Sequence, residues 1–354
     1  ELVDAHEGFA IITDKITTTK KVRLLWIISV LTFFFSAALD NLTTSIVMIS
    51  LLRKLIDDKH DRWFFAGIVV VAANAGGAWS PIGDVTTTML WIGGQLSTMT
   101  IITTLFIPSL VAMLVPLIIL TFTMKGNITR PKLTEGIEHY TNPTTKFERN
   151  LIFFLGVAGL LFVPIFKTVT HLPPFMGMML SLGVLWAVTE IIHSSKNSED
   201  KSQLSVIGVL RKVDTASVLF FLGILLAVAG LQSAGHLVIM AGSLNDLFQG
   251  NVYAINIVIG LLSAIVDNVP LVAGSMGMYE IAETGDFAKD GVFWQFLAFC
   301  AGTGGSALII GSAAGVAVMG LEKIDFVWYL KKISILALVG YFAGAGTYIL
   351  MQSL

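Results

Sequence analysis

The segment "LLSAIVDNVPLVAGSMG" (residues 261–277) decides how this chain folds, because its apolar run is interrupted at the centre. An acid, Asp267, stands there beside an amide, Asn268, and Pro270 follows two residues later. Proline ends the hydrogen-bond ladder of a helix, and a carboxylate is costly at membrane depth. The segment is therefore predicted to be a broken helix whose acid serves a function.

The composition is that of a membrane protein. The 354 residues are 55% hydrophobic and only 13% charged, whereas a soluble domain is usually about 25% charged. The mean hydropathy is +0.81. A net charge of -2 without a basic patch gives no indication of a nucleic-acid partner, so the expected partner is the lipid bilayer. The single cysteine, Cys300, excludes an intrachain disulfide.

The interruption occurs twice in the chain. An earlier segment, "FFSAALDNLTTSIVM" (residues 34–48), carries Asp40 and Asn41 227 residues before the other acid–amide pair. The strings "GGAWSPIGD" (residues 76–84) and "GGSALIIGS" (residues 304–312) form a second pair at an offset of 228. Two signals that recur in one order at nearly one spacing indicate an internal duplication. Paired breaks in two halves are a good sequence indication of a transporter binding site.

The apolar segments predict three regions. A membrane helix needs about 20 apolar residues, and uninterrupted spans lie at 101–123, 151–166, 175–192, 218–231 and 333–351. Residues 1–123 are predicted to form a first repeat, with a hairpin at 24–56 and a broken helix at 63–94. Residues 124–213 form a linker region with two transmembrane helices, at 151–166 and 175–192. Residues 214–354 form a second repeat, with a hairpin at 252–279 and a broken helix at 292–320.

Positive charges predict the orientation. Twenty of the 22 lysines and arginines lie in five clusters, at residues 15–23, 53–62, 125–149, 196–212 and 323–332. With all five on the cytoplasmic side, the first hairpin enters from the cytoplasm and the second from outside. The expected fold class is an all-α polytopic membrane protein with two inverted-topology repeats, each with a re-entrant hairpin and a broken, discontinuous transmembrane helix. The first repeat has no span to match residues 218–231, so residue 1 is expected to follow at least one absent helix.

The breaks carry the expected chemistry. Non-helical backbone at membrane depth is tolerated only inside protein or beside a water-filled cavity. The residues expected to shape the breaks are Gly76, Gly77, Pro81, Gly83, Pro270, Gly304, Gly305 and Gly311. The polar side chains there are acids, amides and hydroxyls, a set that suits a small hard cation. The predicted cation- and proton-binding residues are Asp40, Asn41, Thr43, Asp84, Asp267 and Asn268, with support from Asn74, Ser80, Thr86, Thr303, Ser306 and Ser312.

A buried acid can exchange ions. Burial disfavours its charged form and a bound cation favours it, so one carboxylate can hold either a proton or a metal ion. We expect Asp267, with Asn268, to carry the proton in exchange for the cation. Asp40 with Asn41 is expected to complete the site, and Asp84 to support it. The alternative is that each acid only caps the half-helix that follows it.

The strings "ALDNLTTSIVM", "AANAGGAWSPIGDVTTTMLW" and "AIVDNVPL" resemble the NhaD-type Na⁺/H⁺ antiporters of the ion transporter superfamily, with "ELVDAHEGF" and "SLLRKLI" as support. This resemblance covers nearly the whole chain. It implies that Na⁺, and Li⁺, are exchanged for H⁺ across a bacterial inner membrane, without a cofactor. Carried over residue by residue, it points to Asp40, Asn41, Asp84, Asp267 and Asn268, and Na⁺ is expected at Asp40, Asn41, Asp267 and Asn268. A homodimer is the assembly to be tested.

The predicted function is thus secondary active transport rather than an enzymatic reaction. One alternative is a carrier of an organic or oxyanion substrate from the same superfamily. Another is an intramembrane hydrolase with an aspartate dyad, which requires two acids within hydrogen-bond range. Asp40 and Asp267 are the candidates for such a dyad, because they lie at equivalent positions in the two repeats.

Overall fold

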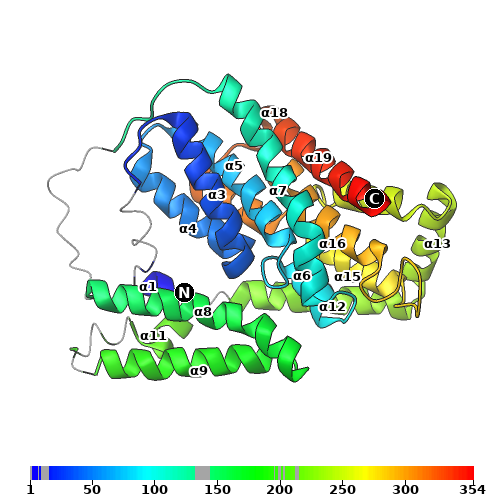
Figure 1. Ribbon diagram of the computed structural model, residues 1–354, viewed down its shortest axis with the longest axis horizontal. Coiled ribbons are helices and arrows are strands. Elements are labelled where there is room, and N and C mark those ends of the chain that lie inside the picture. The colour runs from blue at the N-terminus through cyan, green and yellow to red at the C-terminus, as the bar shows by residue number, and fades with distance from the viewer. Residues whose placement is uncertain are drawn as a thin grey trace. The chain divides into compact units, whose positions relative to one another are not determined.

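The computed structural model describes residues 2–6, 8, 16–131, 144–194, 196, 197, 201, 204–211 and 215–354 (Figure 1). Within that part of the chain every regular element is a helix, apart from two isolated β-bridges. The predicted all-α class is therefore confirmed for the described residues. The chain divides into two compact units. The first is Glu1–Thr18 with Pro131–Leu219, and the second is Thr19–Arg130 with Phe220–Leu354.

Five helices in the described ranges are long and apolar enough to cross a membrane. They are α3 (Lys21–Leu39), α7 (Thr98–Thr123), α8 (Lys146–Thr170), α9 (Pro174–Ile192) and α19 (Ser334–Ser353). A bent pair, Leu225–Ser233 with His236–Phe248, makes a sixth span if its 81° bend lies within one crossing. Four of the five predicted uninterrupted spans coincide with α7, α8, α9 and α19, and the fifth lies in α12 (Thr215–Ser233).

In the first unit, α8 and α9 lie side by side (Figure 1), with α1 (Leu2–Ala5) and α11 (Val206–Leu210) beside them. A capping box between Thr145 and Glu148 begins α8. A buried histidine pair joins α1 to the end of α9, since His6 Nε2 lies 2.8 Å from His193 Nε2. His6 Nδ1 lies 2.7 Å from the Leu2 carbonyl oxygen. Residues 1, 7 and 9–15 of the predicted first repeat lie outside the described residues.

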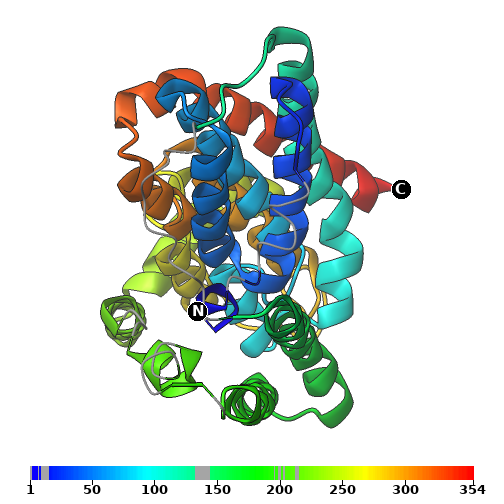
Figure 2. The same ribbon diagram turned by 90° about the vertical axis from the view of Figure 1, so that its left-hand side faces the viewer.

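Two helices with long buried segments form the core of the second unit. Every residue of α16 (Val292–Gly304) from Phe293 onward is buried. Every residue of α5 (Lys59–Ala78) from Phe65 onward is also buried. Helices without an exposed face belong in a core. α7 and α19 pack on each other and on α16. The helices α3 and α4 (Asn41–Leu55) pack together, as the blue ribbons of Figure 2 show.

Each of the four interrupted regions breaks within its polar stretch. α3 and α4 meet at Asp40, and α5 is followed by α6 (Val85–Ile92). In the second half, α14 (Val252–Leu262) is followed by α15 (Asn268–Met278). α16 continues through η1 (Gly305–Ala307) to α17 (Ala313–Glu322). The remaining helices of this unit are α13 (His236–Phe248) and α18 (Phe326–Lys332).

The same backbone contacts recur in both halves. A Cβ on Gly76 would overlap the Phe33 carbonyl, and a Cβ on Gly304 would overlap the Gly260 carbonyl, which lies 227 residues after Phe33. Only glycine permits such a close approach of two backbones. Ser36 Oγ donates to the Ala73 carbonyl at 2.6 Å, and Ser263 Oγ donates to the Ala301 carbonyl at 3.2 Å. These contacts support the internal duplication, whereas the inverted orientation of the repeats and the three predicted regions stay predictions.

Candidate functional site

Asp84 lies at the N-terminus of α6, in the break that follows α5. Its Oδ1 accepts hydrogen bonds from the Thr86 N–H at 2.8 Å and from Thr86 Oγ1 at 2.7 Å. These bonds make Asp84 an N-cap, as the sequence allowed. Its side chain turns inward, however, and the residue is only 1% exposed. The cap uses Oδ1, so Oδ2 is available for partners from other helices.

Two asparagines from the two halves of the chain converge on this carboxylate. Asn41, the first residue of α4, donates from Nδ2 to Asp84 Oδ2 at 2.5 Å. Asn268, the first residue of α15, has its Nδ2 at 3.5 Å from both carboxylate oxygens. Asn41 and Asn268 are 4% and 2% exposed, respectively. The two acid–amide pairs therefore meet through their amides, with Asp84 between them.

Asn74 extends the network to the break of the second half. Its Oδ1 accepts the other amide hydrogen bond of Asn41 at 3.0 Å. Its Nδ2 donates to Ser306 Oγ at 3.0 Å and to Ser312 Oγ at 2.9 Å. Ser312 is the N-cap of α17, where its Oγ accepts from the Gly315 N–H at 3.2 Å. All four broken regions thus contribute to one buried polar network.

The two tip acids lie apart from this network. Asp40 has a φ of +76° and caps α4, accepting from the Thr43 N–H at 2.8 Å and from Thr43 Oγ1 at 2.9 Å. Asp267 caps α15 through a bond of 3.3 Å from the Val269 N–H. Both acids are partly exposed. The structure gives them separate capping partners, so they do not form the hydrogen-bonded dyad that an aspartate hydrolase requires.

The other predicted site residues support the backbone. Ser80 Oγ donates to the Ala37 carbonyl at 2.6 Å, and Thr303 Oγ1 donates to the Phe299 carbonyl at 2.6 Å. Pro270 lies in the first turn of α15, where a missing N–H costs nothing. The remaining glycines allow close backbone approach, with Gly77 against Gly83, and Gly305 against Gly311. Pro81 lies in the turn between α5 and α6.

Two serines that hold helices together at the breaks were not among the residues predicted from the sequence. Ser36 and Ser263 hold α3 and α14 against the buried helices α5 and α16. They lie 227 residues apart, which is the offset of the acid–amide pairs. That repeated spacing is the signal that would have found them.

The electrostatics of the site rest on one carboxylate. Its hydrogen-bond partners are neutral amide, backbone and hydroxyl groups, and no described lysine, arginine or histidine forms an ion pair with it. A buried charge without a counter-ion is unstable, so such a carboxylate either takes a proton or binds a cation. The described residues contain no cluster of three or more His, Cys, Asp or Glu side chains suited to a metal. The donor set is therefore one acid with amide and hydroxyl oxygens, which suits a hard cation.

A family model described as "Citrate transporter" matches residues 2–295. The chain belongs to this transporter family. The chain is 51% identical over its whole length to sodium/proton antiporter 1 of Arabidopsis thaliana, and 47% identical to sodium/proton antiporter 2 of that plant. It is 33% identical, over 93% of its length, to the Na⁺/H⁺ antiporter NhaD of Vibrio cholerae.

The chain spans 60% of the first plant relative, 82% of the second and 70% of the Vibrio protein. These matches confirm the NhaD-type resemblance that the motifs indicated. The chain thus belongs to a family of membrane transporters. Asn41, Asn74, Asp84 and Asn268 lie within the residues matched by the family model, whereas Ser306 and Ser312 lie beyond them.

Proposed function

We propose that this protein exchanges Na⁺, and Li⁺, for H⁺, and that Asp84 is the carboxylate that holds either ion. The observation that carries this proposal is a buried acid whose partners are all neutral and come from both halves of the chain. The names of the sodium/proton antiporter relatives support the choice of ions. The sequence favoured Asp267 as the exchanging acid, whereas the geometry favours Asp84 because it is more deeply buried and lies at the centre of the network.

The amides give the exchange a physical basis. In the structure Asn41 and Asn268 present their N–H groups to Asp84, and these groups compensate part of the charge of the carboxylate. When Na⁺ arrives, rotation of either amide would present its oxygen instead. Through Asn41, Asn74 connects this carboxylate to the hydroxyl oxygens of Ser306 and Ser312. Proton and Na⁺ therefore compete for one site, and the protein need not bind both at once.

A carrier of citrate or another organic anion is the second candidate, and the description of the family model favours it. An anion site is expected to contain a cationic side chain or to rely on backbone N–H groups. The network around Asp84 instead contains a carboxylate, which would repel an anion. This difference makes cation exchange the better-supported function.

The test is dye-reported proton release from energised vesicles that contain the full-length protein. Addition of Na⁺ or Li⁺ is expected to release protons, whereas K⁺ and citrate are not. While the acid is protonated, apparent Na⁺ affinity should rise about tenfold per pH unit, because one proton competes with one cation. Citrate uptake without proton release would instead show that the protein carries an organic anion. An Na⁺ affinity that does not depend on pH would contradict the proposal that one carboxylate holds both ions.

The membrane in which the protein resides is also a proposal. Relatives from Vibrio support the expected bacterial inner membrane, whereas the relatives at 51% and 47% identity come from a plant. Fractionation of the source organism, followed by immunoblotting, decides between a bacterial inner membrane and a plant membrane. The homodimer stays a prediction that the mass of the purified protein in detergent will test.

A further inference from the structure

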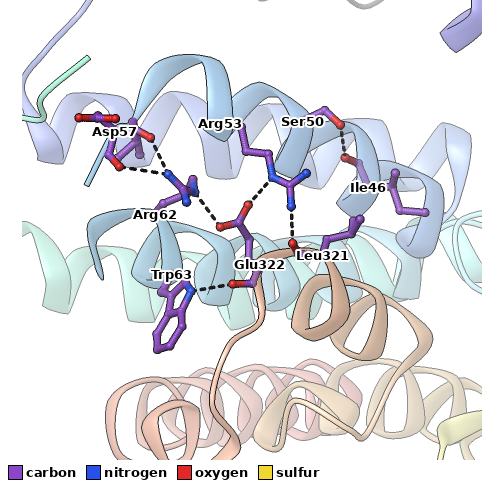
Figure 3. A network of polar contacts seen from close by, with 9 residues as sticks. Ile46, Ser50, Arg53, Asp57, Arg62, Trp63, Leu321 and Glu322 are labelled. Atoms are coloured by element: carbon purple, nitrogen blue, oxygen red, sulfur yellow. Dashed lines mark hydrogen bonds and ion pairs between the residues drawn. The ribbon is translucent and has the colours of Figure 1, made fainter. Parts of the chain in front are cut away.

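A second buried carboxylate lies at the far ends of three helices that contribute side chains to the network around Asp84. Glu322 is the last residue of α17, and its side chain is 1% exposed. It accepts from Arg53 Nε at 2.6 Å and from Arg62 Nε at 2.7 Å, as Figure 3 shows. Arg53 belongs to α4 and Arg62 to α5, so one side chain fastens three helices together.

The contact also satisfies the last carbonyl groups of α17. Arg53 Nη2 donates to the Leu321 carbonyl, and Trp63 Nε1 donates to the Glu322 carbonyl at 2.9 Å (Figure 3). The final carbonyls of a helix have no partner within the helix, and the helix dipole disfavours a carboxylate there. Glu322 therefore depends on its two arginines, and the arrangement is a built junction rather than a chance ion pair.

Arg62 extends this junction to the end of α4. Its Nη1 donates to the carbonyls of Ile56 and Asp57 at 3.1 and 3.2 Å. The ends of α4 and α17 and the beginning of α5 are thus held by one set of side chains.

The opposite ends of these three helices carry the cation site. α4 begins at Asn41, α5 carries Asn74 near its end, and α17 is capped by Ser312. Asn74 binds the other two side chains, at 3.0 and 2.9 Å. From the site to the junction the distances along the three helices are about 18, 18 and 15 Å, at 1.5 Å per residue. The helices therefore form a frame that is fastened at both ends.

We propose that Glu322, with Arg53 and Arg62, is a positioning residue for the cation site. The junction keeps α4, α5 and α17 at fixed angles, and so keeps Asn41, Asn74 and Ser312 in register around Asp84. A helix released at one end can tilt, and a tilt moves the oxygens at its other end. This inference rests on the proposed cation exchange, because it assigns the junction a role in that binding site.

The first test is Glu322→Gln, which keeps the size of the side chain but removes its charge. We expect the apparent Na⁺ affinity to weaken about tenfold, because coupling through packed helices has effects of that size. The maximal exchange rate should stay within about twofold of wild type. The matched control is Asp61→Asn. Asp61 is the neighbour of Arg62 in α5 and pairs with Lys21 at 2.6 Å, but it does not reach α17. That pair is partly exposed, so its loss should change affinity less than about twofold.

A double variant separates positioning from a general loss of stability. Ser312→Ala removes the bond that ties α17 to Asn74 at the site. Once that end is free, Glu322→Gln should weaken Na⁺ affinity by much less than it does alone. If the two substitutions acted independently, their fold losses of Na⁺ affinity would multiply in the double variant. Arg53→Lys retains a cation beside Glu322 and should preserve most of the affinity.

Two readouts distinguish the possible outcomes. Proton release measures exchange, and the rise in Tm on adding Na⁺ measures binding without transport. If wild type neither exchanges nor is stabilised by Na⁺, the proposed function is overturned. If wild type does both and folded Glu322→Gln has unchanged Na⁺ affinity, only the positioning role is overturned. If Glu322→Gln does not fold, Arg53→Gln replaces it, because this side chain is 48% exposed and Arg62 still pairs with Glu322. Unchanged affinity in that variant equally overturns the inference.

Discussion

Asn41 donates one amide hydrogen to Asp84 Oδ2 across 2.5 Å and the other to Asn74 Oδ1 across 3.0 Å. This relationship brings the start of α4 to the break that follows α5. It also turns the amide, rather than the neighbouring Asp40 carboxylate, toward the site. The acid at each tip caps the helix that follows it, whereas the amide one position later contacts Asp84.

The roles of the acids can be separated by substitution. Asp84→Asn keeps the shape of the side chain but cannot titrate, so Na⁺-induced proton release should fall to the level of protein-free vesicles. Asp267→Asn retains a residue that caps α15 well, so exchange should continue, with apparent Na⁺ affinity within about tenfold of wild type. Both variants are compared at equal amounts of membrane protein. Exchange by Asp84→Asn together with none by Asp267→Asn would return the exchanging role to Asp267.

The breaks should depend on glycine at two equivalent positions. In Gly76→Ala and Gly304→Ala the new Cβ meets the carbonyl of Phe33 or of Gly260, and a backbone contact cannot move aside as a side chain can. We expect both variants to insert into the membrane but to lose exchange. Gly346→Ala in α19 is the control, because nothing lies within 4 Å of its added Cβ. Normal exchange by both break variants would disprove the need for close approach.

The re-entrant hairpin is tested by labelling. α3 alone is long enough to cross a membrane, so the side on which α4 ends decides between a hairpin and an ordinary crossing. In a Cys300→Ser background, cysteines at the exposed positions Lys20 and Lys59 should both resist an impermeant thiol reagent applied to whole cells. A cysteine at Glu283 should react. Labelling of only one of the first two positions would show that α3 and α4 together cross the membrane.

The histidine pair predicts how stability depends on pH. Burial, and then the charge of Lys196, lower the pKa of His193 to about 4, and burial lowers the pKa of His6 below 6.5. Glu148 in α8 and Glu190 in α9 oppose this shift. The neutral rings therefore stabilise the fold above about pH 6.5, and this contribution is lost as the pH falls toward 4.

His193→Gln can still donate to His6 but does not titrate. Between about pH 7.5 and pH 5, Tm should fall by several degrees less in this variant than in wild type. His236→Gln, which replaces an exposed ring, serves as the control and should follow wild type. Parallel curves for wild type and His193→Gln would contradict the prediction.

The amino-acid sequence determined the class of the protein and where its helices break. Long apolar segments have only one solution in a bilayer, and an acid, a glycine pair or a proline interrupts a helix through local chemistry. The two acid–amide pairs and the repeated glycines could therefore be recognised without a structure. So could Asn74, Asp84, Ser306 and Ser312 as members of a polar set.

Only the tertiary structure decided which of these residues meet. Asn41 and Asp84 lie 43 residues apart, Asn268 and Asp84 184, and Arg53 and Glu322 269. Asp267 is the N-cap of α15 and bonds to the Val269 N–H, whereas Asn268, the first residue of the helix, reaches Asp84. Which of them does so depends on how α15 is rotated against α6. That rotation is set by packing between distant segments, and no local pattern in the sequence records it.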